Sequence, residues 1–196
     1  MNLAEMSQQL TIALTNQLNY DEEKREIIAY AIETALLAIS GAFLILVFGL
    51  LLNALVPALI AAAFGGSLRR VSGGAHFNTP LKCLFSGALM YSVIGFLAVK
   101  LMNLNLMNQS FLLILLISSL LAVSILSPVQ SEAKPIHSKS LRHKLKIASI
   151  VFVLLTALIT YISTNSLVNI SAVLGVFSQS ITLLPMFNKK GGEMGL

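Results

Sequence analysis

The sequence predicts an all-α, polytopic membrane protein with about six transmembrane helices and an amphipathic interfacial helix at its N-terminus. Hydrophobic residues make up 56% of the 196 residues and charged residues only 11%, whereas a soluble domain carries about 25% charged residues. Apolar runs recur through the chain, and a helix of about 20 residues crosses a hydrocarbon core of roughly 30 Å. Most soluble folds are therefore excluded, and we expect residues 1–196 to form a single membrane domain.

Residues 1–25 are expected to form an amphipathic helix that precedes a bundle over residues 34–187. Apolar residues recur in residues 1–18 at steps of three and four, with polar residues between them, which is the pattern of one helical face. Its length and polar face suit a helix in the membrane interface. Packing on a partner subunit is the alternative. Because the segment lacks the features of a signal peptide, the first span is expected to serve as its own insertion signal.

The next uncharged stretch is too long for one crossing. No charged residue lies between Glu33 and Arg69, and a helix over that stretch would extend roughly 50 Å. Asn53 and Pro57 favour a turn, since proline removes a backbone donor and disfavours helix in the residue before it. We therefore predict two antiparallel spans, at about 34–52 and 55–68.

Four further spans are predicted at about 83–100, 109–127, 146–164 and 168–187. Cytoplasmic loops carry an excess of lysine and arginine. With six spans and a cytoplasmic N-terminus, twelve of the 13 basic residues fall inside and only Lys100 falls outside. One long span over 34–68 would worsen this division to ten against three, because Lys24 and Arg25 would change sides. The charges favour six spans with both termini in the cytoplasm.

The net charge of +5 is explained by this topology. Basic residues lie in short clusters between apolar runs rather than along one face or in a tail, so we expect no nucleic-acid partner. The sequence carries no P-loop and no metal-ligand cluster, and we expect neither a metal nor another cofactor. The single cysteine, Cys83, has no intramolecular disulfide partner.

The stretch RRVSGGAHFNTPLKC, residues 69–83, lies between the second and third predicted spans, at the cytoplasmic mouth. In a continuous helix His76 and Cys83 would stand about 10.5 Å apart along the axis, too far for proton transfer from the thiol to the imidazole. Gly73 and Gly74 loosen the backbone before His76. We therefore predict a loop that brings His76 back toward the residues that follow it.

A new helix is predicted to begin at Pro80, with Thr79 as its N-cap. Cys83 would then lie in or just past the first turn, where the helix dipole, Lys82 and a nearby imidazolium favour the reactive thiolate. Such a thiol requires a polar, hydrated pocket, and four nearby residues are candidates to line it: Arg69, Arg70, Ser72 and Asn78. The alternative is a cysteine that acts as a small hydrophobe beside arginines that only set topology.

RRVSGGAHFNTPLKC, followed by LFSGALMYSVIGF, resembles the accessory gene regulator protein B (AgrB) family in its arginine, glycine-glycine, histidine and cysteine pattern. The charged amphipathic N-terminus, the multi-span layout and the later loop SPVQSEAKPIHSKSLRHKLK are also similar to that family. Two departures are Val71, where many members have an aromatic residue, and Phe77, where a small residue is frequent. Both leave the two chemical groups in place.

The resemblance implies a membrane cysteine endopeptidase of quorum sensing, in the cell membrane of a Gram-positive bacterium. His76 would be the general base and Cys83 the nucleophile that holds the precursor as a thioester, which an internal precursor nucleophile then displaces to give a thiolactone. Backbone amides near Gly73, Gly74 or the start of the new helix are oxyanion candidates. The implied partners are a small amphipathic AgrD-like precursor, the lipid bilayer and a second copy of the chain in a homodimer.

The later loop, near residues 128–145, contributes basic residues that are first a topology signal and second a docking strip for an acidic precursor tail. These residues are Lys134, Lys139, Arg142, Lys144 and Lys146. His137 and His143 are alternative bases, and Ser72 or Asn78 could orient His76. The other function class left open is a non-enzymatic exporter or peptide-binding membrane protein, which predicts that Cys83 tolerates replacement.

Overall fold

The computed structural model describes residues 9–13, 21–75, 79–130 and 138–188, and the regular structure within these ranges is helical. The predicted all-α class is confirmed, and each of the six predicted spans falls on a helix, although the last helix of the six ends at Ile181, before the predicted residue 187. These helices are α2 (Glu22–Leu51), α3 (Leu55–Ser72), α4 (Pro80–Asn103), α5 (Gln109–Leu126), α6 (Lys139–Ile162) and α7 (Ser166–Ile181), followed by the short 3₁₀ helix η1 (Pro185–Phe187).

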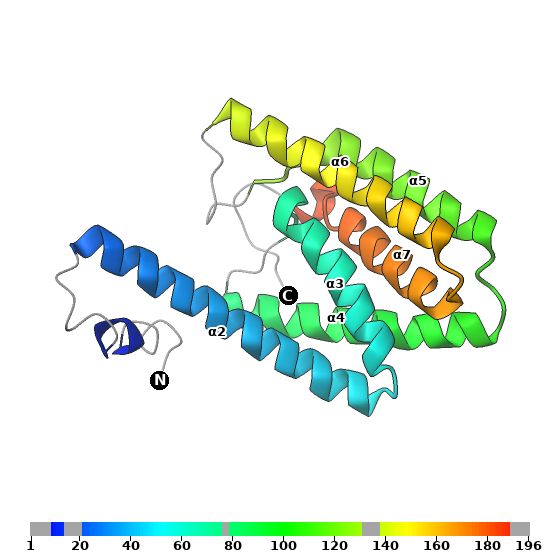
Figure 1. Ribbon diagram of the computed structural model, residues 1–196, viewed down its shortest axis with the longest axis horizontal. Coiled ribbons are helices and arrows are strands. Elements are labelled where there is room, and N and C mark those ends of the chain that lie inside the picture. The colour runs from blue at the N-terminus through cyan, green and yellow to red at the C-terminus, as the bar shows by residue number, and fades with distance from the viewer. Residues whose placement is uncertain (1–8, 14–20, 76–78, 131–137, 189–196) are drawn as a thin grey trace.

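Four of the described helices, α2, α4, α5 and α6, are long and apolar enough to cross a membrane, so the chain is a multi-pass membrane protein. The apolar helix α7 has only 16 residues, and α3 carries two arginines in its last turn. These two helices pack against each other and are central to the bundle: α3 also contacts α2, α4 and α6, and α7 also contacts α4, α5 and α6 (Figure 1). Helices that face other helices rather than lipid accept small and polar residues.

Capping side chains set helix starts that the apolar pattern does not reveal. Asp21 Oδ1 accepts a hydrogen bond from the Lys24 amide at 3.1 Å, so α2 begins at Glu22 and includes the charged segment predicted to precede the bundle. Ser138 Oγ accepts from the Leu141 amide at 3.4 Å, so α6 begins at Lys139. The two helices therefore begin before residues 34 and 146, where the predicted spans start, since a polar first turn is stable once its free amides are capped.

The turn predicted near Asn53 is confirmed. Asn53 has a φ of 50°, in the left-handed region that asparagine enters more readily than most residues. Pro57 lies in the first turn of α3, where its missing N–H removes no helical hydrogen bond. Of the predicted N-terminal helix, the structure describes residues 9–13, which are helical.

Candidate active site at Cys83

Cys83 lies one turn inside the N-terminal end of α4. Pro80 is the first residue of the helix and Thr79 is its N-cap, as predicted, although the Thr79 hydroxyl makes no capping hydrogen bond. The Cys83 amide donates to the Thr79 carbonyl at 3.2 Å, and the amides of Leu81 and Lys82 come before the first residue with a helical acceptor. The half-buried thiol is therefore close to the positive end of the helix dipole.

Arg69 contacts the thiol from the neighbouring helix. Because α3 extends to Ser72 rather than ending at the predicted residue 68, Arg69 lies in its last turn. Its Nη2 atom donates to the Ala75 carbonyl and lies 3.6 Å from Cys83 Sγ. Among the described residues, no carboxylate lies within ion-pair distance of Arg69; the ion pair that these residues form joins Lys24 to Asp21 in another part of the molecule. Arg69 thus contacts both the sulfur and the residue that directly precedes His76.

The glycine pair forms a tight turn at the end of α3, rather than the loosened backbone that we predicted. Gly73 has a φ of 70° and Gly74 a φ of 137°, a region that side chains rarely enter. Space is also limited, because a Cβ at Gly73 would lie 2.1 Å from the Val129 carbonyl oxygen and one at Gly74 would lie 2.6 Å from Thr182 Oγ1. Both glycines are thus required by backbone conformation and by close packing.

Residues far away in the sequence hold this turn. Gln179 of α7 donates from Nε2 to the Gly73 carbonyl at 2.7 Å and to Ser72 Oγ at 3.4 Å. The Ala75 amide donates to the Thr182 carbonyl at 3.3 Å, and the Val129 amide donates to the Ser72 carbonyl at 2.9 Å. Sequence reasoning did not find these contacts. The available signal was a glutamine within an apolar span, since a polar side chain there needs a partner.

Tyr91 is a second residue that the sequence analysis missed. It lies two turns after Cys83 on α4, is 7% exposed, and packs its ring on Gly65 of α3, where a Cβ would lie 2.7 Å from Cε1. Its hydroxyl has no hydrogen-bond partner in the described part of the chain. Because helical side chains lean toward the N-terminus, we expect the Tyr91 ring to lean toward the end of α4 that carries Cys83.

The remaining predicted residues are divided between two regions. Arg70 and Lys82 are exposed beside the site, and Ser72 is buried in the turn. His76, Asn78, Lys134 and His137 lie outside the described residues. The other docking candidates lie in the first turns of α6 instead of the predicted loop, together with the exposed His143. We name the four docking candidates on α6 the basic strip: Lys139, Arg142, Lys144 and Lys146.

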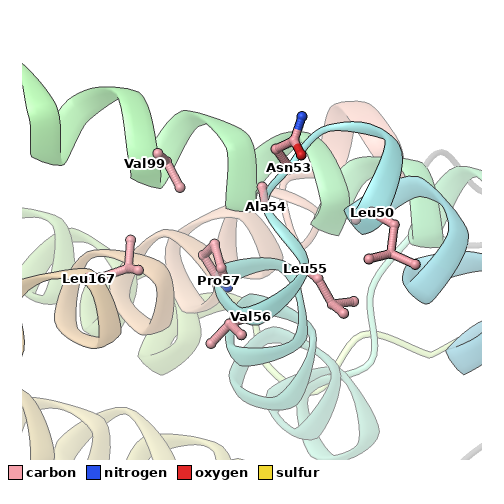
Figure 2. Close-up of a pocket in the computed structure, with 9 residues that line it drawn as sticks. Leu50, Asn53, Ala54, Leu55, Val56, Pro57, Val99 and Leu167 are labelled. Atoms are coloured by element: carbon pink, nitrogen blue, oxygen red, sulfur yellow. The ribbon is translucent and has the colours of Figure 1, made fainter.

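An apolar groove of about 370 Å³ lies at the opposite end of the bundle, around the α2–α3 turn. Figure 2 shows Pro57 of α3, Val99 of α4 and Leu167 of α7 in its lining. Pro57 and Arg69 are separated by roughly 18 Å along α3, at about 1.5 Å per residue. The groove is therefore distant from Cys83, and the chemistry centres on the thiol instead.

The chain matches the model of a known protein family. The model of the family Accessory gene regulator B aligns with residues 7–183, a range that includes the whole Arg69 to Cys83 segment. The chain belongs to the Accessory gene regulator B family. Similar proteins with AgrB names include an AgrB-like protein of Clostridium perfringens, 31% identical over 91% of this chain and 89% of the relative.

Further AgrB relatives extend this similarity to other bacteria. The accessory gene regulator protein B of Staphylococcus intermedius is 35% identical over 72% of each chain. An AgrB-like protein of Lactiplantibacillus plantarum is 25% identical over 97% of this chain and 92% of the relative. No solved structure matches the chain. The sequence resemblance to AgrB is thereby confirmed at the level of the family.

Proposed function

We propose that this AgrB-family protein is a membrane cysteine endopeptidase of agr quorum sensing, which cleaves a small autoinducing-peptide precursor and promotes its cyclisation. The observation that carries the proposal is the double contact of Arg69, with Cys83 Sγ and with the carbonyl of Ala75. A cation beside the sulfur favours nucleophilic thiol chemistry. The same cation binds the residue directly before His76, which supports a histidine that works on this thiol.

In the proposed first step, His76 accepts the thiol proton and Cys83 Sγ attacks the scissile carbonyl carbon of the precursor. The charge that develops on the carbonyl oxygen is stabilised by the Arg69 guanidinium and by the amides of the first turn of α4. The C–N bond then breaks, and His76 passes the proton to the leaving amine. The N-terminal part of the precursor remains on Cys83 as a thioester.

In the second step a cysteine thiol of the bound precursor passes its proton to His76 and attacks this thioester, and Cys83 leaves as the thiolate. The product is a thiolactone, and the nucleophile is restored without an external reagent. Since one thioester replaces another, the exchange is nearly balanced in energy. Removal of the product, or destruction of the released C-terminal fragment, then pulls the reaction forward.

The precursor is proposed to approach from the cytoplasmic side. The basic strip in the first turns of α6 offers a cluster of cations to an acidic precursor tail, and the lysine and arginine distribution favours cytoplasmic termini and a cytoplasmic catalytic loop. The chain would act as one membrane domain in the cell membrane of a Gram-positive bacterium. The family resemblance further suggests a homodimer.

The test is co-expression with the small reading frame expected beside the gene, with precursor size followed by mass spectrometry. Wild type should cleave, whereas Cys83→Ala and His76→Ala should not at equal membrane levels. His143→Ala is the matched control and should cleave like wild type. If it fails to cleave while His76→Ala remains active, the base lies on α6. Cleavage that persists in Cys83→Ala would refute the peptidase and leave export or peptide binding as the better interpretation.

A further inference from the structure

Gln179 is a fully buried amide in the last turn of α7, 0% exposed. A buried polar side chain in a membrane protein is unfavourable unless it is hydrogen-bonded. Its Nε2 atom donates to the Gly73 carbonyl and to Ser72 Oγ, whereas its Oε1 atom has no partner among the described residues. Both recorded bonds of the side chain are thus made to the end of α3 and the turn after it.

A second bond from the same end of α7 holds the other side of this turn. The Thr182 carbonyl accepts the Ala75 amide at 3.3 Å and also accepts Asn188 Nδ2 at 2.7 Å. Residues 73–75 are therefore fixed at both ends by α7 and the residue that follows it. Ala75 in turn presents its carbonyl to Arg69, whose same nitrogen contacts Cys83.

The amide group of Gln179 provides more than volume at this position. A Cβ at Gly74 would lie 2.9 Å from Gln179 Nε2, so the glycine turn fits closely around the amide. An unbranched apolar side chain such as methionine would fill similar space, but it would donate no hydrogen bond to Gly73. The directional contribution of residue 179 is therefore separable from its packing.

We propose that Gln179 is a positioning residue for the thiol chemistry at Cys83. It holds residues 73–75 so that the Ala75 carbonyl keeps Arg69 directed at the sulfur, and it does not itself contact the precursor. The inference rests on the proposed function for its kinetic readout. Its chemical readout, the reactivity of the thiol, depends only on the geometry of the site.

The experiment compares wild type, Gln179→Met and the matched control Ser180→Ala. Ser180 is the next residue on α7, is also buried, and donates its hydroxyl to the Val176 carbonyl of its own helix. Since Cys83 is the only cysteine, the rate of alkylation by iodoacetamide reports on a single thiol. Gln179→Met should change this rate severalfold and lower kcat about tenfold to hundredfold, as expected for a misplaced reacting group, with KM near wild type.

Ser180→Ala should match wild type in both measurements. Wild-type alkylation and kcat in Gln179→Met, or equal losses in Ser180→Ala, would overturn the inference, because packing alone would then account for residue 179. If wild type does not cleave the precursor, the proposed function fails while the alkylation comparison still decides the positioning role. Should Gln179→Met not accumulate in the membrane, Gln179→Leu, which also lacks the donor, is measured by the same criteria.

Discussion

Replacement of Arg69 by lysine is expected to slow both alkylation of Cys83 and precursor cleavage, even though the positive charge is kept. In the wild type one guanidinium nitrogen serves the Ala75 carbonyl and Cys83 Sγ together. A lysine ammonium is a compact charge on a flexible stem and lacks the planar donor fork of arginine. We therefore expect it to retain one of the two contacts at most.

The size of the effect follows from the bond that is lost. A hydrogen bond made by a charged group contributes about 1.5–3 kcal/mol, and each 1.4 kcal/mol corresponds to about a factor of ten in rate. The contact to Sγ is 3.6 Å long and is the weaker of the two. Loss of that contact alone predicts that kcat falls about tenfold. Loss of the Ala75 bond predicts a larger fall in kcat, toward about a hundredfold.

The assay is single-turnover cleavage of the precursor in membranes, with iodoacetamide labelling of Cys83 measured in parallel. Arg70→Lys is the matched control, because Arg70 is the adjacent residue and is exposed. It should retain wild-type rates. The reasoning is refuted if Arg69→Lys keeps wild-type cleavage and labelling, or if Arg70→Lys loses as much as Arg69→Lys.

Two further predictions concern stability and docking. In Gly95→Ala the new Cβ would lie 2.4 Å from the Ala58 amide nitrogen of α3. Because backbone must move, we expect the free energy of unfolding to fall by about 1–3 kcal/mol or more, measured as a lower thermal midpoint in detergent. The control is Gly87→Ala, on the same helix with nothing within 4 Å of the new Cβ, which should leave the midpoint unchanged. Replacing the residues of the basic strip with glutamine should raise KM, weaken the dependence of KM on salt concentration and leave kcat unchanged. A fall in kcat with unchanged KM would contradict docking.

The positions of the helices could be read from the sequence because they depend on local patterns. Apolar run lengths located all six, and the Asn53 turn and the Pro80 helix start follow from the backbone preferences of single residues. Boundaries were less accurate at α2 and α6. There the capping side chains of Asp21 and Ser138 extend the helices into charged sequence that hydropathy alone excludes.

The site was only partly predictable, since its parts meet through tertiary packing. Arg69 and Cys83 were both candidates from a single stretch, and the structure brings them together. Gln179 and Tyr91 were not: Gln179 is distant in sequence from the glycine turn that it contacts, and Tyr91 has mainly apolar neighbours that give no sign of its packing against α3. The chemical role of His76 stays a prediction, as that residue lies outside the described part of the chain.

The hydrogen bonds from α7 to the glycine turn also have a consequence for biosynthesis. Ribosomes build the chain from its N-terminus, so Cys83 enters the membrane before the residues that hold its surroundings in place. At about 5–20 residues per second, the interval between translation of Cys83 and of Gln179 is roughly 5–20 s. During that interval the nascent protein carries its thiol in an unfinished site. A chain still attached to the ribosome would thus be inactive until α7 has inserted.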